Sequence, residues 1–132
     1  KSYSLNYSGN RFLAAFAIDE GMKGYDSSRL SFLYPFEGSK LGFIYQETEE
    51  LSSGMKKNGG VLSFITNINS KGRIKFQYAV SSMKIDSGKH STIGYDHQLI
   101  QGLRIFTFYS VLNSRVTSKE KNIFSIGLEY NF

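Results

Sequence analysis

The side chains of this sequence that could support acid–base or nucleophilic chemistry are few. There are two histidines, His90 and His97, and no cysteine, which excludes thiol catalysis, cysteine-ligated zinc and disulfides. His97 follows Asp96 directly, but neighbouring residues of a strand point to opposite faces, so these two do not form a catalytic pair or a metal site. The sequence holds no Gly-x-Ser-x-Gly nucleophile elbow and no glycine-rich phosphate-binding motif. We therefore expect no enzyme activity, no catalytic residue, no metal ligand and no cofactor.

Charged residues are the other chemically active group. The chain has 16 Lys and Arg against 11 Asp and Glu, a net charge of +5. This excess is compatible with a solvated surface, a basic pore lining or a nucleic-acid-binding face. Binding of single-stranded nucleic acid would need aromatic and basic residues interleaved on one face. Here they fall on opposite parities of the strands described below, so we expect no nucleic-acid partner.

The hydrophobic pattern has a period of two along most of the chain. The clearest stretch is 122–132, in which one parity is apolar, with Phe124, Ile126, Leu128, Tyr130 and Phe132, and the other parity is small or polar. This alternation predicts a strand with one apolar face and one polar face. Nine Tyr, eleven Phe, thirteen Gly and one Pro also favour strands and tight turns. No run approaches the ~18 apolar residues that a membrane-spanning helix needs.

The same reasoning predicts about nine antiparallel strands, at 2–8, 11–18, 29–36, 40–47, 61–69, 73–85, 91–99, 103–113 and 122–132. Their lengths suit a tilted crossing of a bilayer, which takes roughly 9–11 residues. The predicted connections alternate: short turns at 9–10, 37–39, 70–72 and 100–102, and longer loops at 19–28, 47–60, 86–89 and 114–121. Short turns on one rim and longer loops on the other are typical of outer-membrane β-barrels.

The segment from Ser91 to the end resembles the C-terminal hairpin of the general porins of Gram-negative bacteria. Those porins typically have a Gly-x-x-Tyr-x-Leu strand, a short basic turn, an aromatic return strand and a Gly-Leu-x-x-x-Phe ending. Here Asp96-His97 follow Gly94-Tyr95 directly, and Ile100-Gln101-Gly102 stands in place of the basic turn. The matching residues here are Gly94, Tyr95, Leu99, Phe108, Tyr109, Ser110, Gly127, Leu128 and Phe132. The closing strand is similar to that of outer-membrane barrels in general, whose terminal Phe helps the barrel-assembly machinery to recognise the chain. The resemblance thus implies a membrane-insertion signal formed by Phe124, Ile126, Leu128, Tyr130 and Phe132.

The resemblance implies a fold, a place and a function. The implied fold is an all-β, antiparallel transmembrane barrel of sixteen strands. Such a barrel needs more than the 132 residues of this sequence. We therefore expect residues 1–132 to be the C-terminal half of one barrel domain in the bacterial outer membrane. The function is a homotrimeric, water-filled channel for passive diffusion of small hydrophilic solutes or ions, and its partners are outer-membrane lipid and the assembly machinery.

The parity of the strands predicts which side chains face lipid and which face the channel. The apolar parity, from Tyr3 and Leu5 to Ile126 and Leu128, is expected to face lipid. The polar parity is expected to line the pore, and its charged or amide members are Arg29, Lys40, Arg73, Lys75, Gln77, Asp96, Arg104 and Glu129. Basic residues exceed acidic ones here, which favours mild anion preference. The alternative is that these charges pair with each other and only keep the pore wall hydrated.

Two other architectures remain open. A soluble or periplasmic β-barrel would turn the aromatic parity inward and bind a lipid or another apolar ligand. A complete eight-stranded outer-membrane barrel would need residues 2–8 to lie outside the barrel or to overlap another strand.

Overall fold

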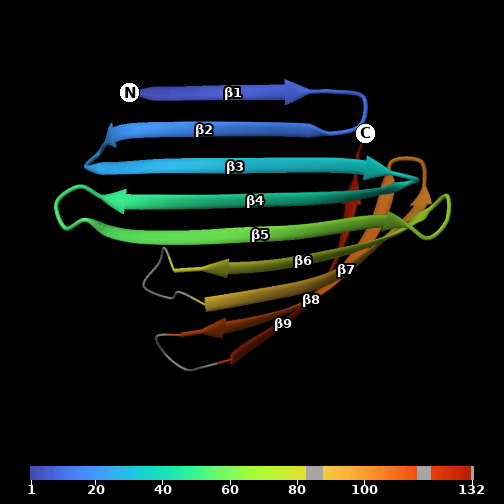
Figure 1. Cartoon of the computed structure of the whole chain (residues 1–132). Helices are drawn as coiled ribbons and strands as arrows, with labels where there is room; N and C mark the ends of the chain where they lie inside the picture. Colours follow the sequence, from blue (N-terminus) through green and yellow to red (C-terminus); the bar gives the residue numbers. More distant parts are fainter. Residues whose placement is uncertain (83–87, 116–119, 132) are drawn as a thin grey trace.

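The chain forms one antiparallel β-sheet. The computed structural model describes residues 1–82, 88–115 and 120–131, and in these residues no helix is long and apolar enough to cross a membrane. Nine strands follow one another in chain order across the sheet, each paired with its neighbours in sequence (Figure 1). The strands are β1 Ser2–Ser8, β2 Leu13–Met22, β3 Tyr25–Phe36, β4 Ser39–Glu50, β5 Met55–Asn67, β6 Gly72–Ser81, β7 Gly88–Ile100, β8 Leu103–Ser114 and β9 Glu120–Tyr130. The predicted all-β class and the number of strands are confirmed.

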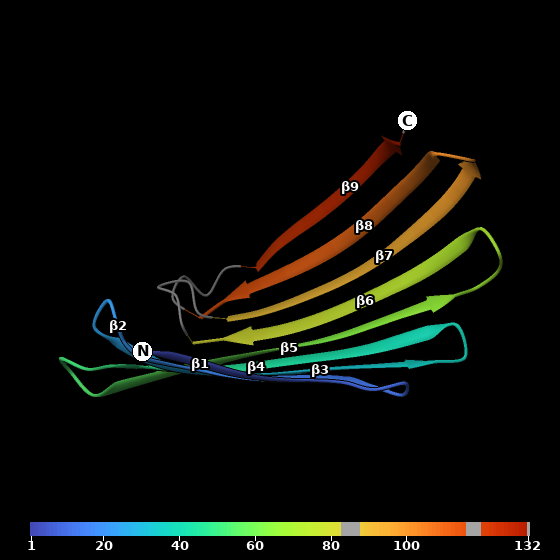
Figure 2. The ribbon, with the colours of Figure 1, turned by 90° about the horizontal axis from the view of Figure 1, so that it is seen from above.

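The sheet is open, with β1 and β9 as its two edges. Within the described ranges, β1 pairs only with β2 and β9 only with β8. Figure 2 shows that β6–β9 turn away from the plane of β1–β5, as expected from the twist of a large sheet. The predicted closure into a barrel is not shown by this sheet and stays a prediction. Because the strands are antiparallel throughout, β1 and β9 run in the same direction.

The register keeps one parity of every strand on each face. Tyr7 lies opposite Ala14, Ala14 opposite Phe32, and Phe32 opposite Phe43. We call the face that contains these residues the apolar face. Across the nine strands it includes Tyr3, Leu5, Tyr7, Phe16, Leu30, Phe32, Leu41, Phe43, Phe64, Phe76, Tyr78, Ile93, Tyr95, Tyr109, Phe124, Ile126, Leu128 and Tyr130. The opposite side is called the polar face.

The sheet has no hydrophobic core of its own. In the part of the chain that the structure describes, no apolar residue is buried, and Leu5 and Phe124 are 74% and 70% exposed. A single layer of sheet cannot bury both faces, so the apolar face needs a second layer or an apolar solvent.

Two predicted long loops are wrong. The predicted loop 19–28 is mostly strand, and β2 and β3 are separated only by Lys23 and Gly24. The predicted loop 47–60 is likewise taken up by β4 and β5, which leaves 51–54 as the connection. Lys23 and Gly24 both have positive φ, as a type I′ hairpin turn requires, and backbone pairing continues although the side chains are polar. Loop length therefore does not separate the two rims at these hairpins.

The other predicted boundaries differ in smaller ways. The end of the predicted strand 73–85 and most of the predicted loop 114–121 lie outside the described residues. The predicted two-residue turn at Gly9-Asn10 is wrong, because residues 9–12 form the connection and Arg11 lies in it. Gly9 does not have the expected positive φ, and a Cβ there would lie 2.7 Å from the hydroxyl at the end of the Tyr7 side chain.

Connections 9–12, 37–38, 68–71 and 101–102 lie at one rim of the sheet, where β9 also ends. We call this the C-terminal rim and the other the opposite rim. Gly102 joins β7 to β8 with φ +81°, and its carbonyl accepts a hydrogen bond from the Asn131 N–H at 2.8 Å. This contact fastens the end of β9 to the rim.

Gly102→Ala should destabilise the sheet more than Gly54→Ala. Both glycines have positive φ, +81° and +66°, which costs an alanine ~1–2 kcal/mol. Only at position 102 would the new Cβ also meet backbone, at 2.6 Å from the Asn131 carbonyl oxygen; at Gly54 nothing lies within 4 Å. We expect a loss of ~1 kcal/mol for Gly54→Ala and ~3 kcal/mol for Gly102→Ala in urea-induced unfolding. Equal losses would show that β9 is not held at this turn.

Candidate functional site

The register places all eight predicted pore-lining residues on the polar face. Arg29 lies opposite Gln46, Lys40 and Lys75 both lie opposite Ile65, and Gln77 lies opposite Ser63. The remaining four are joined by direct pairing of Arg73 with Asp96 and of Arg104 with Glu129. Four residues of the predicted insertion signal, Phe124, Ile126, Leu128 and Tyr130, lie on the apolar face, and the fifth, Phe132, lies outside the described residues.

Asp96 is the centre of a charged cluster on β6–β9. Its side chain is among the most enclosed of the described residues, and the residue is 5% exposed. Three cations converge on its Oδ2: Lys75 Nζ at 2.5 Å, Arg73 Nη2 at 2.9 Å and Arg104 Nη1 at 3.0 Å. A carboxylate with so little water around it needs such partners, because an unpaired buried charge is costly.

Arg104 extends this cluster to the edge strand. Its Nη1 donates to Asp96 and its Nη2 donates to Glu129 Oε2 on β9. The other Glu129 oxygen accepts from Asn131 Nδ2 at 3.3 Å. Three cations and two carboxylates therefore share four adjacent strands, and the cluster keeps an excess of one positive charge. Charge pairing, the alternative left open by the sequence, is present among these residues, together with a surplus of one positive charge.

A hollow of about 290 Å³ lies beside the cluster at the C-terminal rim, and we call it the rim hollow. It is lined by Asn67, Asn69, Ser70, Lys71, Arg73, Asp96, Gln98 and Arg104. The connection 68–71 is shaped by Asn69, whose Oδ1 accepts from the backbone N–H groups of Lys71 at 2.9 Å and Gly72 at 2.7 Å. Sequence reasoning missed the polar side chains of this turn. The signal in the sequence is Asn69 followed two residues later by Lys71-Gly72, a pattern typical of an Asx turn.

The other predicted wall residues do not join this cluster. Arg29 donates from Nε at 3.1 Å and from Nη2 at 2.6 Å to the amide oxygen of Gln46, a partner that sequence reasoning did not single out. A neutral amide orients the guanidinium without cancelling its charge. Among the described residues Lys40 makes no ion pair. These two cations add to the positive surplus on the polar face.

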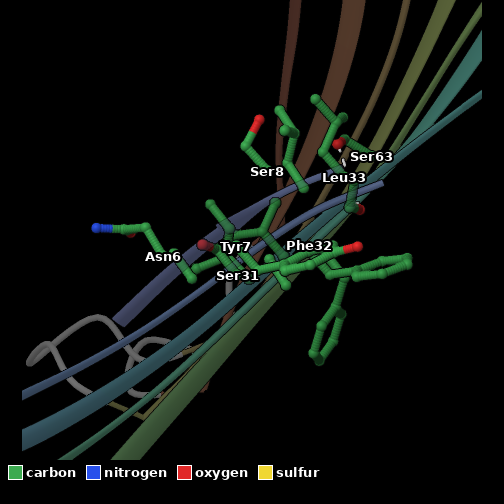
Figure 3. Close-up of a pocket in the computed structure, with 14 residues that line it drawn as sticks. Asn6, Tyr7, Ser8, Ser31, Phe32, Leu33 and Ser63 are labelled. Atoms are coloured by element: carbon green, nitrogen blue, oxygen red, sulfur yellow. Dashed lines mark hydrogen bonds between the residues drawn. The ribbon is translucent and has the colours of Figure 1, made fainter. Parts of the chain in front are cut away.

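The polar face also has an apolar region, which the parity argument did not separate from the rest. A hollow of about 450 Å³ lies over β1–β5, and the side chains around it include Ser31, Leu33 and Ser63 (Figure 3). Leu13, Ile44 and Val61 also line it. A Cβ on Gly42 would lie 2.5 Å from Ser63 Oγ, so glycine leaves space between these side chains. The polar face is thus charged over β6–β9 and mostly small or apolar over β2–β5.

The two histidines lie on different faces. His97 is on the apolar face opposite Gly72, and its Nδ1 lies 3.0 Å from the Tyr95 hydroxyl. His90 is on the polar face, where its Nε2 lies 3.1 Å from Thr92 Oγ1. Within the described part of the chain no three His, Asp or Glu side chains are grouped as a metal site would require.

Comparisons with protein-family models, with curated proteins and with solved structures find no match to this chain. The structure therefore defines a class, a nine-stranded antiparallel all-β sheet, and assigns the chain to no family.

Asp96→Asn should destabilise the sheet more than Glu129→Gln. The first change leaves three cations around a nearly inaccessible neutral amide, whereas the Glu129 side chain is 43% exposed and has one cationic partner. We expect a loss of about 2 kcal/mol for Asp96→Asn and a smaller loss for Glu129→Gln, because solvent screens the exposed pair. The free energy of unfolding from urea titrations of both variants gives the comparison. A larger effect of Glu129→Gln would place the centre of the cluster on Arg104.

Proposed function

We propose that this chain is part of an outer-membrane β-barrel channel of the general porin type, which passes small hydrophilic solutes by passive diffusion with a mild preference for anions. The observation that carries the proposal is the apolar face. It has large apolar side chains on every strand, and many of them are exposed, from Tyr3 on β1 to Tyr130 on β9. In a bilayer this face contacts lipid, and the polar face lines water.

Aromatic side chains gather on the apolar face near the C-terminal rim, which supports an interfacial belt there. At the C-terminal rim, rings on the apolar side lie close to one another in the pairs Tyr7–Phe12 and Tyr34–Phe36, with centroids 4.9 and 5.6 Å apart. Tyr95 and Tyr130 lie near the same rim, on β7 and β9. Aromatic side chains gather at the headgroup level of outer-membrane barrels, because the ring is apolar and the hydroxyl reaches water.

The sizes of the side chains favour curvature toward the polar face. The polar face has small residues at Ser31, Gly42, Ser63, Gly94 and Ser125, among larger ones such as Leu33, Ile44 and Phe106. On the apolar face the residues of the same strands are mostly large and aromatic. A curved sheet crowds the side chains on its concave side and spreads those on its convex side, so small residues suit the interior of a barrel. This supports lipid outside and solutes inside, and it disfavours the soluble barrel with aromatic side chains turned inward.

Strand direction sets how such a barrel could close. Because β1 and β9 run the same way, direct pairing between them would be parallel. Antiparallel closure needs an odd number of further strands, as in the sixteen-stranded barrel implied by the resemblance. The complete eight-stranded alternative is disfavoured, because β1 pairs with β2 along Ser2–Ser8 and is a regular strand of the sheet.

The remaining features of the proposal follow from the class. The partners are outer-membrane lipid, the barrel-assembly machinery and two further copies in a homotrimer. Anion preference is supported by the predicted pore-lining residues, among which Arg29, Lys40, Arg73, Lys75 and Arg104 outnumber Asp96 and Glu129. Cation-rich walls attract anions electrostatically.

Single cysteines on neighbouring residues test the channel directly, because residues 1–132 contain no cysteine that would react beside the introduced one. Gln77→Cys lies on the polar face and Phe76→Cys on the apolar face of the same strand. In the natural protein reconstituted in a planar bilayer, a charged water-soluble methanethiosulfonate should modify the Gln77→Cys variant and change its single-channel current. The same reagent should leave the Phe76→Cys variant unmodified, because lipid covers that position.

The matched control uses fluorophores attached to the same cysteines in vesicles containing a nitroxide-labelled lipid. We expect strong quenching at position 76 and weak quenching at position 77. A protein that stays in the soluble fraction, or that shows no quenching at either position, would contradict the proposal and favour the soluble ligand-binding barrel.

A further inference from the structure

We infer that the rim hollow is a binding site for a compact oxyanion, namely inorganic phosphate or the phosphate group of a small solute. The inference deepens the proposed function by naming the class of solute, and it rests on that function only for its role in passage. The binding site itself rests on the side chains of the hollow. It is built by the turn 68–71, by Arg73 on β6 and by the Asp96–Arg104 pair behind them.

The first argument is charge. Lys71, Arg73 and Arg104 line the hollow, and Asp96 is the one carboxylate in its described lining. That carboxylate is occupied by Lys75, Arg73 and Arg104, all of which reach the same oxygen. Its repulsion of an incoming anion is therefore offset. Lys71 makes no ion pair with any residue in the described ranges, so its charge is not cancelled by a neighbour.

The second argument is the supply of hydrogen-bond donors. A guanidinium carries five N–H donors in a planar fork that matches a phosphate or carboxylate. Of the Arg73 donors, only Nη2 has a partner among the described residues, and the side chain is 43% exposed. Arg104 uses both terminal nitrogens on carboxylates, so it contributes charge and holds Asp96 in place. Arg73 and Lys71 are therefore the two residues whose N–H groups can donate hydrogen bonds to a bound oxyanion.

The third argument is shape and position. Asn67 and Asn69 line the hollow, and the Oδ1 of Asn69 is occupied by backbone N–H groups, so its Nδ2 is the free end of the amide. The volume of about 290 Å³ compares with the ~30 Å³ that a water molecule occupies in the liquid, which leaves room for an oxyanion with part of its hydration shell. A planar cation fork beside a point charge suits a tetrahedral oxyanion better than a halide.

Phosphate binding to the folded, detergent-solubilised natural protein tests the inference. The probe is inorganic phosphate, followed by isothermal titration at constant ionic strength, with chloride as the comparison anion. We expect Arg73→Gln and Lys71→Gln each to weaken phosphate binding about tenfold, the loss of one charge-assisted hydrogen bond. Arg73→Lys should lie between the wild type and Arg73→Gln, because it keeps the charge and loses the fork.

The matched control is Lys40→Gln. Lys40 lies on the polar face at the same rim and is not in the lining of the hollow. Its replacement removes one positive charge without touching the site, so phosphate binding should change little. The site would be overturned if Lys40→Gln weakened phosphate binding as much as Arg73→Gln, or if the wild type did not prefer phosphate to chloride. Either result would mean that anions are attracted by the overall positive charge of the polar face and not by this site. Lys71 lies in a turn and makes no ion pair with a described residue, so its variant keeps the test valid if Arg73 variants fold poorly.

Failure of this inference and failure of the channel proposal are distinguishable. Phosphate binding is measured without a membrane, whereas the cysteine pair at positions 76 and 77 reports the lipid and water faces. Absence of phosphate binding with the expected cysteine pattern would overturn only the rim site. Phosphate binding without the cysteine pattern would leave the site and overturn the channel.

Discussion

The strand register is the constraint on which the other features of this structure depend. Along each strand, alternate residues point to opposite faces of the sheet. A slip of one residue in any pairing would therefore turn the aromatic side chains of the slipped strand to the polar face. The register is kept through nine strands, with irregularities only at Asp19/Met22 and Gln98/Ile100 within the described pairings. The charged cluster depends on it as well, since Asp96 meets Arg73 only because β6 and β7 pair as they do.

The two faces have opposite physical requirements. The apolar face exposes large side chains that no second layer formed by the described residues covers, and the hydrophobic effect favours an apolar environment for them. The polar face carries an enclosed carboxylate and its cations, which require water or pairing. A bilayer outside and an aqueous lumen inside satisfy both. The proposed oxyanion site lies at the C-terminal rim of the polar face, where Lys71, which makes no ion pair with a described residue, lies beside the charged cluster.

Sequence reasoning succeeded where side-chain pattern and backbone pairing agree. The strand predicted at 103–113 is confirmed as Leu103–Ser114, and the predicted wall residues all share one face. It failed at 47–60, where polar side chains suggested a loop, because backbone hydrogen bonding does not need apolar side chains to continue a hairpin. It also failed at Gly9, which lacks the positive φ expected there, because the sequence does not show the backbone conformation of a glycine.

The sequence by itself determined that the chain is all-β and which residues share a face, because the two-residue period of a strand is a local property. It also predicted a basic wall. Only the tertiary structure decided which of these charges meet. Arg73, Asp96 and Arg104 are brought together from β6, β7 and β8, whereas Lys40 stays apart. Cross-strand distances depend on register, and register depends on turn geometry and on the pairing of every strand with its neighbours.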